Sequence, residues 1–427
     1  MILSRHVANR PFARIFAADA IVRTAYQMGK TPVLPLFAAA LGASDILLGL
    51  VVSISTLTGI LVKPVVGFLS DRQGRHIWLL LSAALFILMP FGYLLVTTPS
   101  ELFVLRLAHG LATAIFGPVS LALVAEMAGK GRATRMGIFG LARSFGYLLA
   151  PVSAAFLLTH MPPQILFMMT GLIAAIALVP LLAMTRGQQN MPGDLPRGGA
   201  AARSVSAEFS QLLGSFANAL GAASRRPAIW VAGGLEMMVN MAAYAVKAFL
   251  PLHILMASQS GPALAGHALA GHALVLAGLF FSLQEAAHML MRLPGGMAAD
   301  RFGRLTVIGL GVLLMAGGLL LLPHLNGDAV IIGAVVLGAA QGLIFPASQA
   351  FVADQSGSAM GTGMGLYGAM RNLGKVLGPV IGGFTLTVGS FDDMLIFAAS
   401  LLLALAVFLA AVAGVRRGGR LLRIGSL

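Results

Sequence analysis

Long apolar runs, separated by short polar segments, follow one another along nearly the whole chain. Each run has roughly the 20 residues that an α-helix needs to cross a bilayer, and the runs are too long for the alternating strands of a membrane β-barrel. The expected helices cover residues 14–40, 46–69, 77–97, 102–127, 136–158, 164–184, 228–256, 270–296, 305–323, 330–353, 361–388 and 393–415. The pattern predicts an all-α integral membrane protein with twelve transmembrane helices.

Composition supports this fold class and excludes several functions. Hydrophobic residues make up 58% of the chain and charged residues only 10%, whereas about a quarter of a soluble domain is charged. The absence of Cys excludes disulfides and thiolate metal sites, and His267 and His272 have no acidic cluster nearby to form a metal site with them. No phosphate-binding Gly-x4-Gly-Lys-Ser/Thr loop occurs. We therefore expect neither an enzyme nor a metal or cofactor.

Basic residues are distributed very unevenly between the two sets of connecting segments. One set carries Arg5, Arg10, Arg14, Arg72, Arg75, Lys130, Arg132, Arg135, Arg186, Arg197, Arg203, Arg225, Arg226, Arg301, Arg304, Arg416, Arg417, Arg420 and Arg423. The opposite loops carry only the acids Asp45, Glu101, Asp328, Asp392 and Asp393. The positive-inside rule then predicts a multi-pass protein with both termini in the cytoplasm. The first apolar run follows basic residues but has no small-residue cleavage site, so no removable signal peptide is expected. The compact termini and short loops favour a bacterial inner membrane. The net charge of +14 is read as this orientation signal and not as nucleic-acid binding.

One long polar connection divides the chain. Residues 186–227 are rich in Gly, Pro, Ser and Arg, and they separate an N-terminal six-helix half (1–185) from a C-terminal six-helix half (228–427). Apolar residues at helical spacing between Val205 and Leu220 predict an interfacial amphipathic helix in this cytoplasmic linker, with a disordered linker as the alternative.

The two halves repeat each other. The loop Gly67-x3-Asp71-Arg72-x-Gly74-Arg75 returns in the second half as Gly296-x3-Asp300-Arg301-x-Gly303-Arg304. The pattern Gly137-x8-Gly146-x3-Ala150-Pro151 returns there as Gly365-x8-Gly374-x3-Gly378-Pro379, and the two displacements along the chain are nearly equal. Two motifs in the same order at matching displacements predict pseudo-symmetric halves.

These motifs resemble those of the major facilitator superfamily, over residues 14 to 415. The Gly-x3-Asp-Arg-x-Gly-Arg loops look like its motif A. The expected helix 361–388, with Gly378-Pro379, looks like motif C, whereas the expected helix 136–158, where motif C belongs, has Ala150-Pro151 instead. Arg106-x2-His109-Gly110 is similar to part of motif B, and Pro32-Val-Leu-Pro35 to the drug:proton antiporter branch. The resemblance implies a transporter of six plus six helices. Gly67, Asp71, Arg72, Arg75, Gly296, Asp300, Arg301 and Arg304 are expected to form a latch between two conformations.

Nine bases fall within the expected spans, where each would cost about 2.5 to 3.5 kcal/mol near the lipid core. They are Arg23, Lys30, Lys63, Arg106, Arg143, Lys247, Arg292, Arg371 and Lys375. Glu126 and Arg143 lie on either side of one turn, and Asp354 and Arg371 repeat this arrangement in the second half. We expect these four residues to form two structural ion pairs, while Arg106 either snorkels or pairs with Glu101.

The other bases form stripes on the helices. Asp19-x3-Arg23-x6-Lys30 and Glu236-x3-Asn240-x6-Lys247 have equal spacing, and each trio lies on one helix face. Bases outnumber acids, so the sequence predicts a cavity that binds an anion through Arg23, Lys30, Lys63, Lys247, Arg292 and Lys375. The alternative is an internally satisfied network, for example Asp19 with Arg23.

Proton coupling requires a group that changes its protonation state during transport. Glu285 and His288 share a face of the expected helix 270–296 and are the first candidates. Glu236 and Asp19 follow. The alternative is that Glu285 only neutralises Arg292. We expect a monomeric secondary transporter that moves a small or medium organic anion, such as a carboxylate-rich metabolite or siderophore, with proton coupling and alternating access. A multidrug:proton antiporter and a non-transporting sensor or assembly partner on the same scaffold are the alternatives.

Overall fold

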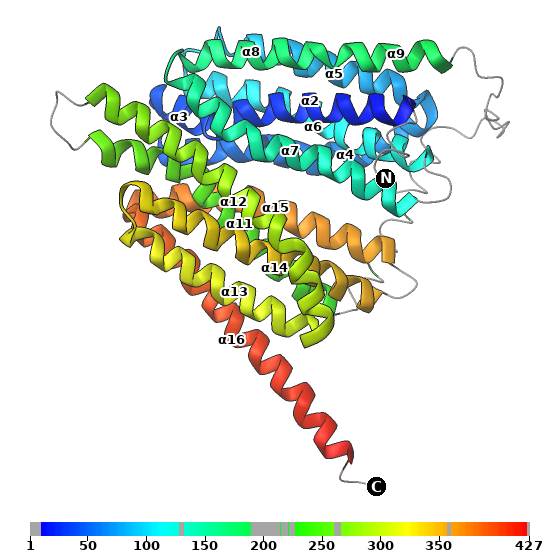
Figure 1. The fold of residues 1–427 in the computed structure, drawn as a ribbon, viewed down its shortest axis with the longest axis vertical. Helices are drawn as coiled ribbons and strands as arrows, with labels where there is room; N and C mark the ends of the chain where they lie inside the picture. Colours follow the sequence, from blue (N-terminus) through cyan, green and yellow to red (C-terminus); the bar gives the residue numbers. More distant parts are fainter. Residues whose placement is uncertain are drawn as a thin grey trace.

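The computed structural model describes residues 10–127, 132–188, 214, 221, 227–259, 266–356 and 360–424, and its regular structure within these residues is entirely helical (Figure 1). The α-helices are α2 (Arg10–Lys30), α3 (Val33–Ala40), α4 (Asp45–Gln73), α5 (Arg75–Gly92), α6 (Pro99–Glu126), α7 (Arg132–Leu158), α8 (Pro163–Ile176), α9 (Leu178–Gln188), α11 (Pro227–Gln259), α12 (Gly266–Phe302), α13 (Arg304–Leu321), α14 (Val330–Ser356), α15 (Met360–Val388) and α16 (Phe391–Ile424). Two short 3-10 helices, η2 (Leu322–His324) and η3 (Gly327–Ala329), connect α13 to α14.

Each of the twelve apolar ranges falls on helical structure. The first range corresponds to α2 and α3, which are interrupted at Thr31 and Pro32, and the sixth corresponds to α8 and α9. Among the described residues, ten helical segments are long and apolar enough to cross a membrane. The other two expected spans are the interrupted α2–α3 pair and α15. The all-α membrane fold predicted from the sequence is confirmed.

The helices form two bundles. Figure 1 shows α2 to α9 in the upper bundle and α11 to α16 in the lower one, with α12 lying beside α7 at the boundary. Many large apolar side chains lie on the outer surface; Leu95 is 81% exposed and Leu290 is 75% exposed. In a chain of this hydropathy such side chains face lipid and not water. The linker of residues 186–227, including the amphipathic helix expected between Val205 and Leu220, lies almost entirely outside the described residues.

The ends of the bundle differ in charge. We call the end with Arg72, Arg75, Arg301 and Arg304 the basic end, and the end with Asp45, Glu101, Asp328 and Asp393 the acidic end. α2 begins at the basic end and α16 extends beyond the bundle on the same side, so the first and last described helices start and finish there (Figure 1).

The two bundles pack tightly only toward the acidic end. A Cβ atom at Gly49 in α4 would collide with the carbonyl oxygen of Pro379 in α15, and a Cβ atom at Gly383 would collide with that of Asp45. A Cβ atom at Gly278 in α12 would likewise come within 2.7 Å of the carbonyl oxygen of Pro151 in α7. Small residues allow this approach of helix backbones. Toward the basic end the two bundles diverge (Figure 1).

Candidate substrate cavity

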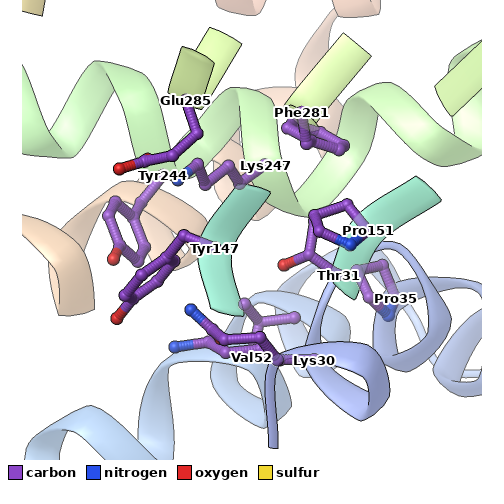
Figure 2. A pocket seen from close by; sticks show the side chains of 11 residues that line it. Lys30, Thr31, Pro35, Val52, Tyr147, Pro151, Tyr244, Lys247, Phe281 and Glu285 are labelled. Atoms are coloured by element: carbon purple, nitrogen blue, oxygen red, sulfur yellow. The ribbon is translucent and has the colours of Figure 1, made fainter. Parts of the chain in front are cut away.

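A cavity of about 460 Å³ lies between the two bundles. Its lining includes five bases, namely Arg23, Lys30, Lys63, Arg143 and Lys375, together with Tyr26, Tyr147, Tyr244 and Asn372. None of the described residues that line it is acidic. Toward the acidic end a smaller pocket of about 30 Å³ follows, which Lys30, Tyr147, Tyr244, Lys247 and Glu285 help to line (Figure 2). The six bases proposed from the sequence therefore divide: four line the large cavity, Lys247 lines the small pocket, and Arg292 lines neither.

A buried carboxylate organises the bases on the N-terminal side. Asp19 is fully buried, and its Oδ2 atom lies 3.0 Å from Nε of Arg23 and 3.5 Å from Nε of Arg143. The hydroxyl of Ser120 donates to its other oxygen at 3.3 Å, and Nη2 of Arg143 donates to the carbonyl oxygen of Gly117 at 3.3 Å. We call Asp19, Arg23 and Arg143 the N-half charge centre. It carries one net positive charge.

The C-terminal half contains the corresponding arrangement. Nε of Arg371 lies 3.4 Å from Oε1 of Glu236, and the amide of Asn240 donates to the same oxygen at 3.1 Å. Glu236 is only 3% exposed. The guanidinium of Arg371 lies over the ring of Phe345, 4.3 Å from its centroid. We call Glu236, Asn240 and Arg371 the C-half charge centre. It is neutral, and the pocket beside it has a volume of only about 20 Å³.

These contacts correct the two ion pairs expected from the sequence. Glu126 binds Arg75 at 2.5 Å instead of Arg143, and Asp354 binds Arg304 at 3.3 Å instead of Arg371. Glu126 is the last residue of α6, whereas eleven residues separate Arg143 from the start of α7. That separation is about 16 Å along the helix axis, beyond the reach of the two side chains. The spacing of Asp354 and Arg371 relative to α14 and α15 gives the same mismatch.

Three lysines surround one tyrosine ring between the halves. The ammonium groups of Lys30, Lys247 and Lys375 lie 5.6, 5.2 and 5.5 Å from the ring centroid of Tyr244, within the range of cation–π attraction. Among the described residues, no carboxylate lies within 4.0 Å of these ammonium groups or of Lys63. The charges of these four lysines are thus left without a carboxylate partner at ion-pair distance among the described residues.

Glu285, His288 and Arg292 form a short chain along α12. Nδ1 of His288 lies 3.6 Å from Oε1 of Glu285, and Nη2 of Arg292 lies 3.9 Å from the same oxygen. Nε of Arg292 donates to Nε2 of His288 at 3.4 Å. Because Nε2 accepts this hydrogen bond, the ring proton of a neutral His288 is placed on Nδ1, facing Glu285. Glu285 therefore lies close to both His288, its expected partner in proton coupling, and Arg292, which it was expected to neutralise in the alternative interpretation.

Arg106 neither snorkels nor pairs with Glu101, which instead accepts from the backbone of Thr97 and Thr98 at the start of α6. The guanidinium is 1% exposed and donates to the hydroxyls of Ser55 at 2.7 Å and of Tyr26 at 3.3 Å. Arg106 thereby fixes the Tyr26 side chain, which lines the cavity.

The repeated loops at the basic end also form matching clusters. Arg75 binds Asp71 at 2.8 Å as well as Glu126, and Arg304 binds Asp300 as well as Asp354. Each cluster joins the ends of three helices in its own half, α4, α5 and α6 in the first and α12, α13 and α14 in the second. Of the other residues assigned to a latch, Arg72 lies over Phe68, Arg301 lies over Phe302, and Gly67 and Gly296 have no close neighbour at the Cβ position.

The sequence reasoning missed the cavity tyrosines. The chain has 24 Phe and only five Tyr, and three of the five (Tyr26, Tyr147 and Tyr244) line the large cavity. In such a chain a Tyr in an apolar helix signals a place where the hydroxyl or an amphipathic ring has a use. That signal was available from composition alone.

Known proteins resemble this chain in sequence and in fold. The family model of the Major Facilitator Superfamily matches residues 20–283 and 261–422. A Bacillus subtilis (strain 168) protein named uncharacterized MFS-type transporter YuxJ is 25% identical over 341 residues, which cover 78% of this chain and 80% of that protein. Another from the same strain, uncharacterized MFS-type transporter YqjV, is 28% identical over 144 residues, or 32% of this chain and 35% of that protein.

Solved structures share the fold at low sequence identity. The nucleoside transporter NupG aligns with a TM-score of 0.74 and 15% identity, over 94% of this chain and 98% of its own. A mutant of a peptide transporter POT aligns with a TM-score of 0.75 and 15% identity, over 94% of each chain. The family match covers most of the chain, and the repeated halves enclose a central cavity as the motifs implied. The chain belongs to the major facilitator superfamily of membrane transporters.

Proposed function

We propose that this chain is a secondary active transporter for a small or medium organic anion, coupled to protons and working by alternating access. The observation that carries the proposal is the 460 Å³ cavity, which five bases and no acid line. The buried Asp19, which does not itself line the cavity, compensates one of these charges. Fixed cations in a partly desolvated site bind carboxylate or phosphate groups and disfavour lipophilic cations.

The orientation follows from the charges at the two ends. With the basic end in the cytoplasm, as the positive-inside rule directs, the cavity is closed toward the outside and extends toward the cytoplasm. The close approach of Gly49 to Pro379 and of Gly278 to Pro151 forms the closed side. In the opposite state these contacts open, and the clusters around Arg75 and Arg304 act as the latch that favours one conformation. Residues 1–185 and 228–427 are then the moving halves, joined by the linker 186–227.

Glu285 and His288 are the proposed proton carriers. Glu285 lines the small pocket next to Lys247, so protonation of its carboxylate changes the charge at the boundary between the halves. The Nδ1 proton of His288 faces this carboxylate. Glu236 and Asp19 are secondary candidates, because protonation of either acid would release an arginine from its charge centre.

A thermal-shift and flux experiment tests the proposal. Purified protein is screened with organic anions and with a lipophilic cation such as tetraphenylphosphonium, and anions that stabilise it are tested for proton-gradient-driven uptake in proteoliposomes. A ligand at 100 times its dissociation constant should stabilise the protein by about 2.7 kcal/mol. Stabilisation by anions, reduced in Lys30→Gln and kept in a variant of the exposed Arg10, Arg10→Gln, is the expected result. Stabilisation by the cation alone would favour a multidrug exporter, and binding without flux would favour a sensor.

A further inference from the structure

The bases that line the cavity gather around two centres, the Asp19 carboxylate and the Tyr244 ring. Resting on the anion transport proposed above, we propose that the substrate is an elongated dianion, with one anionic group bound at each end of the cavity. The first cluster contains Arg23, Arg143 and Lys63, and the second contains Lys30 and Lys375 beside Tyr244. Both clusters line the same space, so one molecule can reach both.

The arginine cluster is built to present its terminal nitrogens. Asp19 lies 3.0 Å from Nε of Arg23 and 3.5 Å from Nε of Arg143, and both arginines line the cavity. The Nη2 groups of both arginines lie beside Gly117, another lining residue, and Nη2 of Arg143 donates to its carbonyl oxygen. Lys63 also lines the cavity and adds a further charge. With one carboxylate against three bases, the cluster retains two positive charges for an incoming anion.

Among the described residues, no carboxylate lies within 4.0 Å of the ammonium groups of the lysine cluster. Lys30 and Lys375 are held near the ring of Tyr244 by cation–π attraction, which leaves their N–H donors available. Lys247 contacts the same ring from the small pocket, which Glu285 also lines (Figure 2). An anion between the two cavity lysines would supply the counter-charge that the described protein residues do not.

The helical spacing sets the distance between the clusters. Arg23 and Lys30 are seven residues apart on α2, so they lie on nearly the same face and about 10 Å apart along the axis. Tyr26 and Gln27 line the wall between them. A compact or singly charged anion can neutralise only one cluster at a time. A chain with an anionic group at each end neutralises both, and this difference is the selectivity we infer.

Calorimetry with a graded ligand series tests this inference. The full-length protein in detergent is titrated with α,ω-dicarboxylates from succinate to sebacate, and with monocarboxylates of the same lengths at matched ionic strength. We expect one dicarboxylate length to bind at least tenfold more tightly than the matched monocarboxylate. Lys375→Gln and Arg23→Gln should each remove this tenfold preference while changing monocarboxylate affinity less than threefold, because one cluster survives in each variant. The control Arg10→Gln should bind like the parent.

The outcomes separate this inference from the function on which it rests. Equal binding of monocarboxylates and dicarboxylates at every length would overturn the two-cluster dianion site and leave anion transport standing. A preference for dicarboxylates that persists in both Lys375→Gln and Arg23→Gln would also overturn it, since the dianion would then bind elsewhere. Binding of tetraphenylphosphonium with no binding of any carboxylate would overturn anion transport itself.

Discussion

The two charge centres occupy equivalent places in the repeated halves, but they face different surroundings. In each centre a buried acid binds the residue four positions later on its own helix, together with an arginine of α7 in the N-half or of α15 in the C-half. The N-half centre pairs Asp19 with two arginines and borders the 460 Å³ cavity. The C-half centre pairs Glu236 with one arginine and an amide and borders a pocket of about 20 Å³.

One position on α6 and α14 accounts for much of this difference. Gly117-Pro118-x-Ser120 in α6 and Phe345-Pro346-x-Ser348 in α14 occupy the same place in the two repeats. Gly117 leaves room for the large cavity beside Arg23 and Arg143, whereas the Phe345 ring lies 4.3 Å from Arg371 and 5.3 Å from Arg292. Arg143 and Arg371 are each 28% exposed, so the halves differ in what lies beside the arginines and not in how far these are buried. Substrate binding is expected beside the large cavity of the first half.

Removing the two acids is expected to give the largest difference between the halves. Asp19→Asn leaves two arginines without their carboxylate, and breaking a buried ion pair costs about 3 to 5 kcal/mol. Glu236→Gln leaves one arginine, which keeps the Phe345 ring, so we expect a smaller loss. Thermal unfolding of the purified variants measures both. An equal or larger loss for Glu236→Gln would show that the charge of the N-half centre is not what the fold depends on.

Exchanging the residues at positions 117 and 345 tests the cavity directly. Gly117→Phe places a ring where the cavity now lies, and its Cβ would meet Nη2 of Arg23 at 3.4 Å, a contact that the flexible side chain can relieve. We expect anion affinity to fall about 100-fold, or about 2.8 kcal/mol, in a folded protein. Calorimetry with the best anion measures this loss.

The reciprocal variant, Phe345→Gly, is the matched control for that exchange. It opens space beside Arg292 and Arg371 without entering the large cavity, whose lining does not include position 345. The anion should therefore bind with nearly the parent affinity even if thermal stability falls. A 100-fold loss in this variant, with Gly117→Phe unaffected, would place the substrate in the C-terminal half.

The fold could be predicted from the sequence because membrane helices leave a strong one-dimensional signal. Apolar length located all twelve ranges, and the paired loops at 67–75 and 296–304 gave the symmetry of the halves. What length could not show is an interruption such as that at Pro32, which divides the first range into α2 and α3. Local backbone geometry decides such breaks, and hydropathy does not contain it.

The sequence predicted the positive charge of the cavity but not the ion-pair partners of its arginines. Helical spacing correctly placed Asp19 with Arg23 on one face, and the excess of bases indicated a net positive cavity, which five bases line. The predicted pairing of Arg143 with Glu126 was wrong. The depth of Arg143 in the membrane depends on where α7 begins, and sequence spacing across a turn does not fix that residue. The covering role of Phe345 was also missed, since Phe is the expected residue type in any membrane helix and carries no signal of its own.

Removing the hydroxyls of two cavity tyrosines is expected to give a smaller difference in stability than removing the two acids. The Tyr26 hydroxyl contacts Ser55 at 3.2 Å and accepts from the buried Arg106, whereas the Tyr244 hydroxyl has no hydrogen-bond partner among the described residues. Tyr26→Phe should therefore destabilise the protein by about 1 to 3 kcal/mol, because it leaves a buried donor unpaired. Tyr244→Phe keeps the ring that attracts the lysines and should change thermal stability very little. A larger effect of Tyr244→Phe would mean that its hydroxyl, and not its ring, organises the lysine cluster.

The basic end is the one region where the halves should respond alike, and there the smallest effects are expected. Arg75 binds Asp71 and Glu126, and Arg304 binds Asp300 and Asp354, with all four acids more than half exposed. Exposed ion pairs contribute about 0.2 to 1 kcal/mol. Double-mutant cycles of Arg75 with Glu126 and of Arg304 with Asp354, in which the arginines and Glu126 become Gln and Asp354 becomes Asn, should give coupling energies in that range that agree between the halves. Coupling that differs clearly between the two cycles would show that the asymmetry of the charge centres extends to the latch, and that one half alone holds the observed conformation.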